Sequence, residues 1–303
     1  MEYLSVTEGV GVLPLRTNIG FVRSGTDCAV IDTGIDEDAG KRILKTAASL
    51  GLTIKAVVNT HSHSDHYGAN TFLAQRTGAE VLAPAGESWV LEEPWLEAAY
   101  LSQGAVPLPQ LMNRFVVGPA SKVDRTFTEG AFSAGGVQLE AVPLPGHSFA
   151  MTGIGAGGVL FCGDALFGEE TVRKHGVLFL HDPDRTRASL LKLETLSYLW
   201  FVPSHGHPCP RNELASLVRK NISAIDAFDD AIVSVLDGPM PMSKLASMAL
   251  VAAGLHLDDT SRITLMQSTA RAHISCLARR GRIVVSPGTK GTDLEDDLVC
   301  SLS

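Results

Sequence analysis

Four side chains that commonly bind metals fall within six residues of this 303-residue chain: His61, His63, Asp65 and His66, in the pattern HxHxDH. Imidazole nitrogens and carboxylate oxygens are the ligands that a borderline divalent cation prefers. Four such groups on one tight turn can face two adjacent metal ions. The pattern therefore predicts a metal centre around which the remaining elements have to be arranged.

The composition is that of a globular chain, with 45% hydrophobic and 19% charged residues. No apolar run is long enough to span a membrane, and residues 1–5 place no basic flank before an apolar core. We therefore expect no membrane partner and no signal peptide. The cysteines are odd in number and lack CxxC spacing, which favours a reducing cytoplasm over a disulfide framework. They are Cys28, Cys162, Cys209, Cys276 and Cys300.

The net charge of −8 is distributed unevenly along the chain. Residues 1–234 carry 18 Lys and Arg against 26 Asp and Glu, residues 235–290 carry 7 against 3, and residues 291–303 carry none against 4. A small basic module therefore follows an acidic body and precedes an acidic tail.

Short apolar runs alternate with amphipathic segments through the first two thirds of the chain. The expected strands cover residues 28–32, 54–59, 137–146, 157–163 and 199–203, and the expected helices cover 37–50, 65–75 and 184–196. Asp184 is the expected N-cap of the last helix. Several strands end in residues that can bind metal, which is typical of layered α/β folds that collect ligands at one sheet edge.

Two regions depart from this alternation. Residues 87–128 are rich in aromatic residues and contain four prolines, which suits either a lid or a surface excursion packed on the body. A long helix is predicted over 211–236, followed by helices over 244–253 and 260–279 and by a strand and turn from residue 281. This order predicts a small winged-helix module.

Three further strand ends carry a residue that can bind metal. His147 lies in Gly-His-Ser, Asp164 in Cys-Gly-Asp and His205 in Ser-His-Gly-His. Each alone is weak evidence for a metal site, because a His or Asp at a strand end is more often structural. In this order after the HxHxDH pattern, the three together are strong evidence for a metal centre. Cys162 is interpreted as a buried strand residue and not as a ligand.

The ordered set of motifs, from Asp32 to His205, resembles the metallo-β-lactamase superfamily over residues 10–210. The resemblance implies a four-layer αββα sandwich with two divalent ions at the sheet edge, here followed by the small helical winged-helix domain. Carried onto this chain, the resemblance implies that one ion binds His61, His63 and His147 and that the other binds Asp65, His66 and His205. It implies that Asp164 bridges the two ions. It also implies that Asp32 accepts a hydrogen bond that orients the histidine loop. Nitrogen and oxygen ligands suit zinc, iron or manganese, and zinc is the expected metal.

By this resemblance, residues 1–212 form the catalytic domain, with 87–128 as a lid-like insertion. Residues 213–303 hold the linking helix, the winged-helix-like domain and the acidic tail. The segments Thr60–Asn70 and Gly163–Phe167 look most similar to glyoxalase II-like thioesterases. True β-lactamases of the best-known subclass have Cys at the position of Asp164, so antibiotic hydrolysis is not the expected main activity.

The first functional hypothesis is hydrolysis of a thioester or related carboxylic ester on a small-molecule or carrier-bound acyl substrate. A hydroxide held between the two ions would attack the carbonyl. The carboxylates counted as catalytic are Asp65, Asp164 and Asp32. The residues expected to contact the substrate are Arg173, Lys174, Trp95 and Tyr100.

The alternative hypothesis is cleavage of single-stranded RNA, with basic residues of the C-terminal module binding phosphates. Against it, the body is acidic, and residues 235–290 contain no aromatic side chain on which bases could stack. A third hypothesis makes the module a DNA-reading or dimerising element beside a vestigial metal centre. The complete ligand set argues against a vestigial centre, and we expect the module to form a homodimer or to pack on the body.

Overall fold

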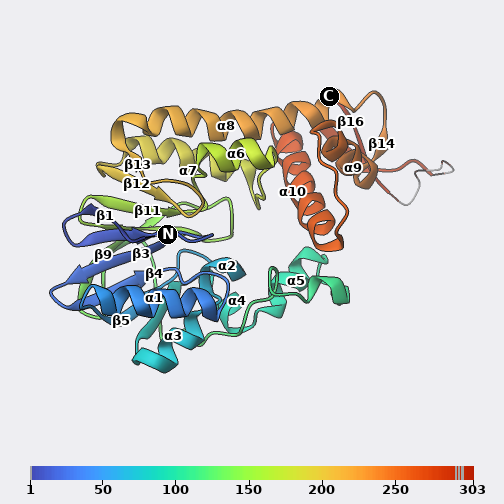
Figure 1. The fold of residues 1–303 in the computed structure, drawn as a ribbon. Helices are drawn as coiled ribbons and strands as arrows, with labels where there is room; N and C mark the ends of the chain where they lie inside the picture. The colour runs from blue at the N-terminus through green and yellow to red at the C-terminus, as the bar shows by residue number, and fades with distance from the viewer. Residues whose placement is uncertain (1, 291, 293, 295–296) are drawn as a thin grey trace.

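Two β-sheets lie face to face in the computed structural model of the chain, and helices cover the outer face of each sheet (Figure 1). The structure describes residues 2–290, 292, 294 and 297–303. None of the helices within this described part is long and apolar enough to cross a membrane.

The first sheet has the strand order β1-β2-β3-β4-β5-β6-β7. Its first four strands are antiparallel, whereas β4 to β7 run parallel to one another. The strands are β1 (Leu4–Thr7), β2 (Val10–Leu13), β3 (Ile19–Ser24), β4 (Asp27–Ile31), β5 (Thr53–Val58), β6 (Glu80–Pro84) and β7 (Arg125–Phe127).

The second sheet has the order β13-β12-β11-β10-β9-β8 and is antiparallel except between β11 and β12. Its strands are β8 (Gly130–Ala134), β9 (Val137–Pro143), β10 (Thr152–Ala156), β11 (Val159–Gly163), β12 (Trp200–Pro203) and β13 (Cys209–Pro210). The helices of the body are α1 (Glu37–Ser49), α2 (Ser64–Tyr67), α3 (Asn70–Thr77), α4 (Ser88–Glu92), α5 (Trp95–Leu101), the 3₁₀ turn η1 (Pro109–Leu111), α6 (Glu169–His175), α7 (Pro183–Thr195) and α8 (Arg211–Ser234).

Strand β4 shows why the sheets need cover on both faces. Successive side chains of a strand point to opposite faces. Ala29 and Ile31 pack in the core between the two sheets, whereas Cys28 and Val30 pack in a second core with residues of α1 and α3. On the far side, Leu160 and Phe201 of the second sheet pack against Leu190 of α7 and Leu214 of α8. The predicted four-layer αββα arrangement is confirmed.

Two local predictions are wrong. The helix expected over residues 65–75 is broken into α2 and α3, with Gly68 and Ala69 between them. Gly68 lies so close to the carbonyl oxygen of Ile35 that a Cβ atom there would clash with it. The N-cap of α7 is Asp182 and not Asp184: its side chain accepts hydrogen bonds from the backbone N–H groups of Asp184 and Arg185. Pro183 occupies the first helical turn, a position where its missing N–H has no cost.

The segment 87–128 is not an irregular loop, because it contains α4, α5, η1 and β7. Ala98, Leu101, Leu111 and Val116 form a small core of its own, against which Leu265 of the C-terminal region packs. The segment therefore touches both the body and the C-terminal region.

The C-terminal region consists of α9 (Met242–Ala252), α10 (Thr260–Arg279) and a sheet with the order β14-β16-β15. Its strands are β14 (Met240–Pro241), β15 (Ile283–Pro287) and β16 (Leu298–Leu302). The helices and β15 follow the predicted order, and the identification as a winged helix stays a prediction. The acidic tail supplies β16, while its residues Asp293, Glu295 and Asp296 lie outside the described residues.

Helix α8 belongs to the body and to the C-terminal region at once. Leu214 and Val218 pack in the core beneath the second sheet, whereas Phe228 and Ile232 pack with α9 and α10. The domain boundary at residue 212 stays a prediction. With that boundary, α8 would belong to the second domain and would still pack in the cores of both domains.

Candidate metal centre

The loop that follows β5 is held by a carboxylate at the end of the neighbouring strand. β4 and β5 are parallel, so Asp32, directly after β4, lies beside this loop. The N–H and the hydroxyl of Thr60 donate to the two oxygens of Asp32 at 2.8 and 2.9 Å, and Nδ1 of His66 lies 2.9 Å from Oδ2. Asp32 adopts a φ of 58°, which is uncommon outside glycine. It thus contacts the loop at three points.

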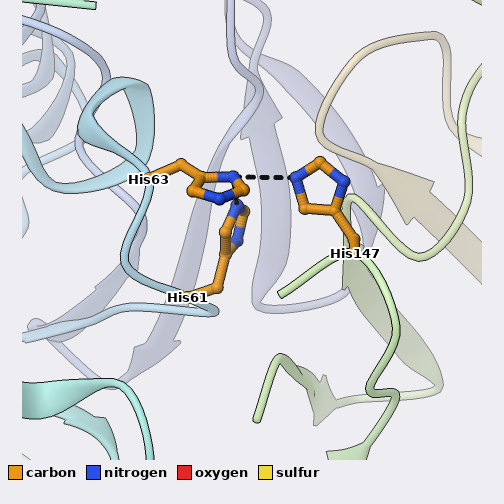
Figure 2. A group of neighbouring side chains, drawn as sticks. All are labelled: His61, His63 and His147. Carbon is orange, nitrogen blue, oxygen red and sulfur yellow. Dashed lines mark hydrogen bonds between the residues drawn. The ribbon is translucent and has the colours of Figure 1, made fainter. Parts of the chain in front are cut away.

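His61, His63 and His147 point ring nitrogens toward one another (Figure 2). Nδ1 of His63 lies 3.1 Å from Nε2 of His61 and 2.8 Å from Nε2 of His147. Two ring nitrogens at such a distance need a proton or a cation between their lone pairs. Since the three nitrogens lie within 4.8 Å of one another, the group can hold one metal ion.

Asp65, His66 and His205 form a second group. The carboxylate of Asp65 lies 3.8 Å from Nε2 of His66 and 3.4 Å from Nε2 of His205. Asp164, directly after β11, reaches both groups, because its oxygens lie 3.5 Å from Nε2 of His147 and 3.7 and 3.4 Å from those of His66 and His205. The structure therefore brings all seven predicted ligands together, with Asp164 between the two groups.

Two atoms of this centre are buried without a hydrogen-bond partner among the described residues: Nε2 of His66 and Oδ1 of Asp164. An unsatisfied buried polar group costs about 1–3 kcal/mol, and native proteins contain few of them. Both atoms lie in groups whose donors are nitrogen and oxygen only. This donor set fits divalent cations, which would be bound by these two atoms.

Backbone carbonyls fix the orientation of two of the imidazoles. Nδ1 of His147 donates to the carbonyl of Phe179 and Nδ1 of His205 to the carbonyl of Arg16, both at 2.9 Å. A carbonyl only accepts, so the neutral ring carries its proton on Nδ1 and directs the lone pair of Nε2 toward the centre. Such outer partners set the tautomer of metal-binding histidines.

Glu87, at the start of the 87–128 segment, joins two of the loops that carry ligands. Its buried carboxylate accepts from the N–H and hydroxyl of Ser62 at 3.2 and 2.5 Å, from the hydroxyl of Ser148 at 2.7 Å and from the N–H of Ala150 at 2.7 Å. Burial raises the pKa of Glu87, although these four hydrogen bonds oppose the shift. This residue was not predicted from the sequence.

Glu97 on α5 lies next to the ring of His63, with one carboxylate oxygen 3.7 Å from Nε2 of His63. Burial, with a smaller contribution from the charge of Glu87, raises the pKa of Glu97 to about 8. This residue was also missed. The 87–128 segment therefore supports the histidine loop through two buried acids, a role that its aromatic composition does not reveal.

The first group of imidazoles is neutral. Burial, followed by the charges of neighbouring histidines, lowers the pKa of His61 well below its ordinary value, and burial lowers the pKa of His63 to about 3. Burial also lowers the pKa of His147. Neutral imidazoles are the form that binds metal.

In the second group the two imidazoles, of His66 and His205, are charged. Burial opposes the charged imidazoles, but the carboxylates of Asp65 and Asp164 outweigh it. They contribute to raising the pKa of His66 to about 9 and that of His205 well above its ordinary value. In turn these imidazoles overcome the effect of burial and hold the pKa of both carboxyls well below their usual range.

A cavity of about 1600 Å³ opens onto the centre and is lined in part by Asp65, Asp164 and His205. Arg173 and Lys174, two of the predicted substrate contacts, also line it. The other two lie elsewhere. Trp95 is half exposed, with its Nε1 donating to Glu93, and the ring of Tyr100 packs near those of Phe149 and His181.

Cys162 packs in the apolar core between the second sheet and helices α7 and α8. Burial raises the pKa of its thiol well above the ordinary value. The sulfur therefore stays protonated and is directed away from the centre, although Asp164 is only two residues along the chain.

The sequence matches the family model of the metallo-beta-lactamase superfamily over residues 12–205. It is also similar to a hydroxyacylglutathione hydrolase from Rhodospirillum rubrum, with 32% identity over 143 residues, and to a beta-lactamase hydrolase-like protein from Xylella fastidiosa, with 29% identity over 150 residues. Each match covers 46% of this chain, and they cover 43% and 32% of the two relatives. The chain thus spans less than half the length of these curated relatives.

Two solved structures resemble nearly the whole chain. A metallo-beta-lactamase family protein from Thermus thermophilus has a TM-score of 0.74 at 20% identity, covering 99% of this chain and 100% of its own. A beta-lactamase domain protein from Burkholderia ambifaria has a TM-score of 0.69 at 20% identity, covering 100% and 94%. At this identity the likeness concerns the fold alone, and it includes the C-terminal region.

Proposed function

The chain belongs to the metallo-beta-lactamase superfamily, and we propose that it is a dinuclear metal-dependent hydrolase acting on a thioester or a related carboxylic ester. The observation that carries the proposal is the position of Asp164 between two groups of three ligands, where buried polar atoms of Asp164 and His66 have no hydrogen-bond partner among the described residues. Similarity to a hydroxyacylglutathione hydrolase supports a thioester as the substrate.

In this proposal His61, His63 and His147 would hold one divalent ion, Asp65, His66 and His205 would hold the other, and Asp164 would contribute to both sites. When bound, two such ions lower the pKa of a water shared between them and polarise the electrophile. Zinc is the proposed metal, since imidazole and carboxylate ligands suit it.

The remaining residues position the ligands. Asp32 accepts from Nδ1 of His66 and holds Thr60, whose hydroxyl lies 3.0 Å from Nδ1 of His61. Because the Thr60 hydroxyl donates to Asp32, it accepts from His61, and this chain fixes the tautomers of both rings. Each ring then directs Nε2 toward the centre. Cleavage of single-stranded RNA is the competing function, and the substrate panel below separates the two.

The test uses metal-free protein reconstituted with zinc, followed by metal analysis and assays on acyl-thioesters and on single-stranded RNA. We expect two ions per chain and thioester turnover with intact RNA. Asp164→Ala should lose roughly 10³-fold in rate, since it removes a group that contacts both sites. The matched control is Asp230→Ala, an exposed carboxylate on α8. A folded Asp164→Ala protein with full activity would contradict the proposal, and RNA cleavage abolished by a chelator would favour the competing function.

A further inference from the structure

We propose that Glu97, a buried acid on α5, is a positioning residue that accepts a hydrogen bond from the outer N–H of His63 and so directs the other ring nitrogen to a metal ion. The inference rests on the proposed function and deepens it, because it gives a residue of the 87–128 segment a task in the site of His61, His63 and His147. That site would then be complete only with this segment in place.

The ring of His63 is oriented differently from the two rings beside it. Nδ1 of His63 lies 3.1 Å from Nε2 of His61 and 2.8 Å from Nε2 of His147 (Figure 2). The other two rings therefore face the group with Nε2, whereas His63 faces it with Nδ1. An ion held by the three rings would bind Nδ1 of His63 and leave Nε2 on the outer side of that ring.

Each of the other four proposed histidine ligands has a hydrogen-bond partner on its outer nitrogen. In these four rings the outer nitrogen is Nδ1, and its partner lies 2.9–3.0 Å away. The partners are the hydroxyl of Thr60, the carboxylate of Asp32 and the backbone carbonyls of Phe179 and Arg16. Such partners fix the orientation and tautomer of histidines that bind metal. The outer Nε2 of His63 needs an acceptor of this kind, because a neutral ring that binds metal through Nδ1 carries its proton on Nε2.

Glu97 is the acid that faces this outer nitrogen. One oxygen of its buried carboxylate lies 3.7 Å from Nε2 of His63. The separation is about 0.5 Å longer than an ordinary N–H···O hydrogen bond, a gap that a small rotation of the Glu97 side chain would close. The positive charge of an ion bound to the ring favours the ionised form of a nearby carboxyl, in which both oxygens accept hydrogen bonds.

The surroundings of Glu97 give its carboxylate no other task. Among the described residues this carboxylate makes no hydrogen bond, whereas the carboxylate of Glu87 accepts four. Burying a polar group without a hydrogen bond destabilises a fold. The stability of the fold therefore does not account for an acid at position 97, and the contact with His63 does.

Helix α5 is held in place by apolar contacts on both sides of Glu97 in the sequence of the segment and beyond it. Ala98 and Leu101 of α5 pack with Leu111 of η1, and Leu265 of α10 packs against the same cluster. Side chains on regular, packed elements hold a site more accurately than side chains on loops. Glu97 therefore has the support that a positioning residue requires, and part of this support comes from the C-terminal region.

The test compares Glu97→Leu, which removes the acceptor, with Glu97→Gln, whose amide oxygen still accepts. Competition with a chelating dye measures zinc affinity, and urea unfolding measures the stability of the metal-free protein. For Glu97→Leu we expect one of the two zinc ions to bind roughly 10–100-fold more weakly, while the urea midpoint of the metal-free protein is unchanged or higher. Glu97→Gln should weaken that ion only roughly 5-fold, because a neutral acceptor replaces a charged one. Glu92→Leu, at an exposed acid on α4, should change neither quantity.

Nuclear magnetic resonance of isotope-labelled histidine reports on the tautomer itself. In the zinc-loaded wild-type protein, His63 should carry its proton on Nε2 and give an N–H signal that exchanges slowly with water. This signal should persist in Glu97→Gln and disappear through fast exchange in Glu97→Leu. A residue that only fills space beside the ring would leave the signal unchanged.

Three outcomes would overturn the proposal. Glu97→Leu could bind both zinc ions as tightly as wild type does, or its zinc-loaded form could keep the Nε2 proton signal of His63. Its metal-free form could also be less stable than wild type or fail to fold, which would give Glu97 a structural role instead. Zinc affinities and ring signals that follow the predictions, without turnover of any thioester, would support the role of Glu97 and refute the proposed hydrolysis.

Discussion

Glu87 is one of the two buried acids through which the 87–128 segment contacts the loops of the metal centre. Its carboxylate holds Ser62 and Ser148, each of which is adjacent to a proposed ligand. We predict that Glu87→Gln, which leaves only one carbonyl oxygen for the four donors, lowers zinc affinity about 10-fold and stability by about 1–3 kcal/mol. Competition with a chelating dye and urea unfolding measure the two effects. Glu92→Gln, an exposed acid on the neighbouring α4, is the control, and equal affinities for both variants would refute the role.

The opposite charge states of the two histidine groups predict a proton linkage. In the metal-free protein His66, with a pKa of about 9, and His205 are both protonated at pH 7, whereas the other three imidazoles are neutral. Metal binding must displace these protons, so affinity rises as the pH increases from 7 toward the raised pKa values of His66 and His205. We expect release of about two protons per chain at pH 7, measured by calorimetry in buffers of different ionisation enthalpy. Fewer protons should be released once the pH exceeds the pKa of about 9 of His66, and a pH-independent affinity would contradict the assignment.

The seven proposed ligands could be found from the sequence because each lies within a few residues of the end of a strand and each has side-chain chemistry that only a few functions use. Glu87 and Glu97 could not, because they approach the histidine loop from a segment whose path is set by tertiary packing. Their residue type is common on surfaces, and no local pattern distinguishes the two buried acids from exposed neighbours such as Glu92 and Glu93.

At the level of elements, the break between α2 and α3 lies directly after the ligand His66. Apolar periodicity predicts one helix over 65–75, but it carries no information on how closely the loop after β4 approaches at Gly68. The carbonyl oxygen of Ile35 on that loop occupies the space where a side chain would begin. The expected strands correspond to β4, β5, β9, β11 and β12, whose apolar residues are a strong local signal, whereas strands such as β2, β3, β6 and β10 were not predicted.

Gly68→Ala tests this close approach. The added methyl group would force α2 away from Ile35, displacing His66 and costing about 1–3 kcal/mol of stability. We expect a lower unfolding midpoint together with weaker zinc binding. Gly238→Ala is a matched control, because no atom lies within 4 Å of the point where its Cβ atom would be added and its φ is not positive. Unchanged metal affinity in a destabilised Gly68→Ala protein would show that the loop adapts without moving the ligands.

At the scale of the whole molecule, a buried ionic cluster ties the body to the C-terminal region. Asp229 on α8 accepts from Nδ1 of His273 on α10 at 2.7 Å, and it also contacts Arg187 of α7 and Arg280, directly after α10, at 2.5 and 2.6 Å. Composition indicated a basic module after an acidic body, but it could not show that α8 runs through both cores or that α10 lines the cavity. These features depend on contacts between residues far apart in the sequence.

This cluster predicts how stability depends on pH. Burial lowers the pKa of His273, although Asp229 opposes the shift. Between the lowered value and about 6.5 the unfolded chain binds a proton that the folded chain does not, so stability falls as pH drops through this window. Burial opposes ionisation of Asp229, but His273 and Arg280 lower its pKa to about 2. Its contribution is therefore lost only between about pH 3.9 and 2.

His273→Gln keeps a donor for Asp229 but removes the titration. We expect the variant to be less stable than wild type by about 1–2 kcal/mol at pH 7.5. This difference in the free energy of unfolding should be smaller at pH 5.5, because only the wild type is destabilised by the proton that His273 binds in the unfolded chain. Urea unfolding at both pH values measures the gap, and the other histidines cancel in the difference. For His256→Gln, at an exposed position in the same region, the free energy of unfolding should depend on pH as it does in the wild type. If the His273→Gln profile is also parallel, the folded and unfolded states bind this proton equally, and His273 does not couple α8 to α10 through its charge.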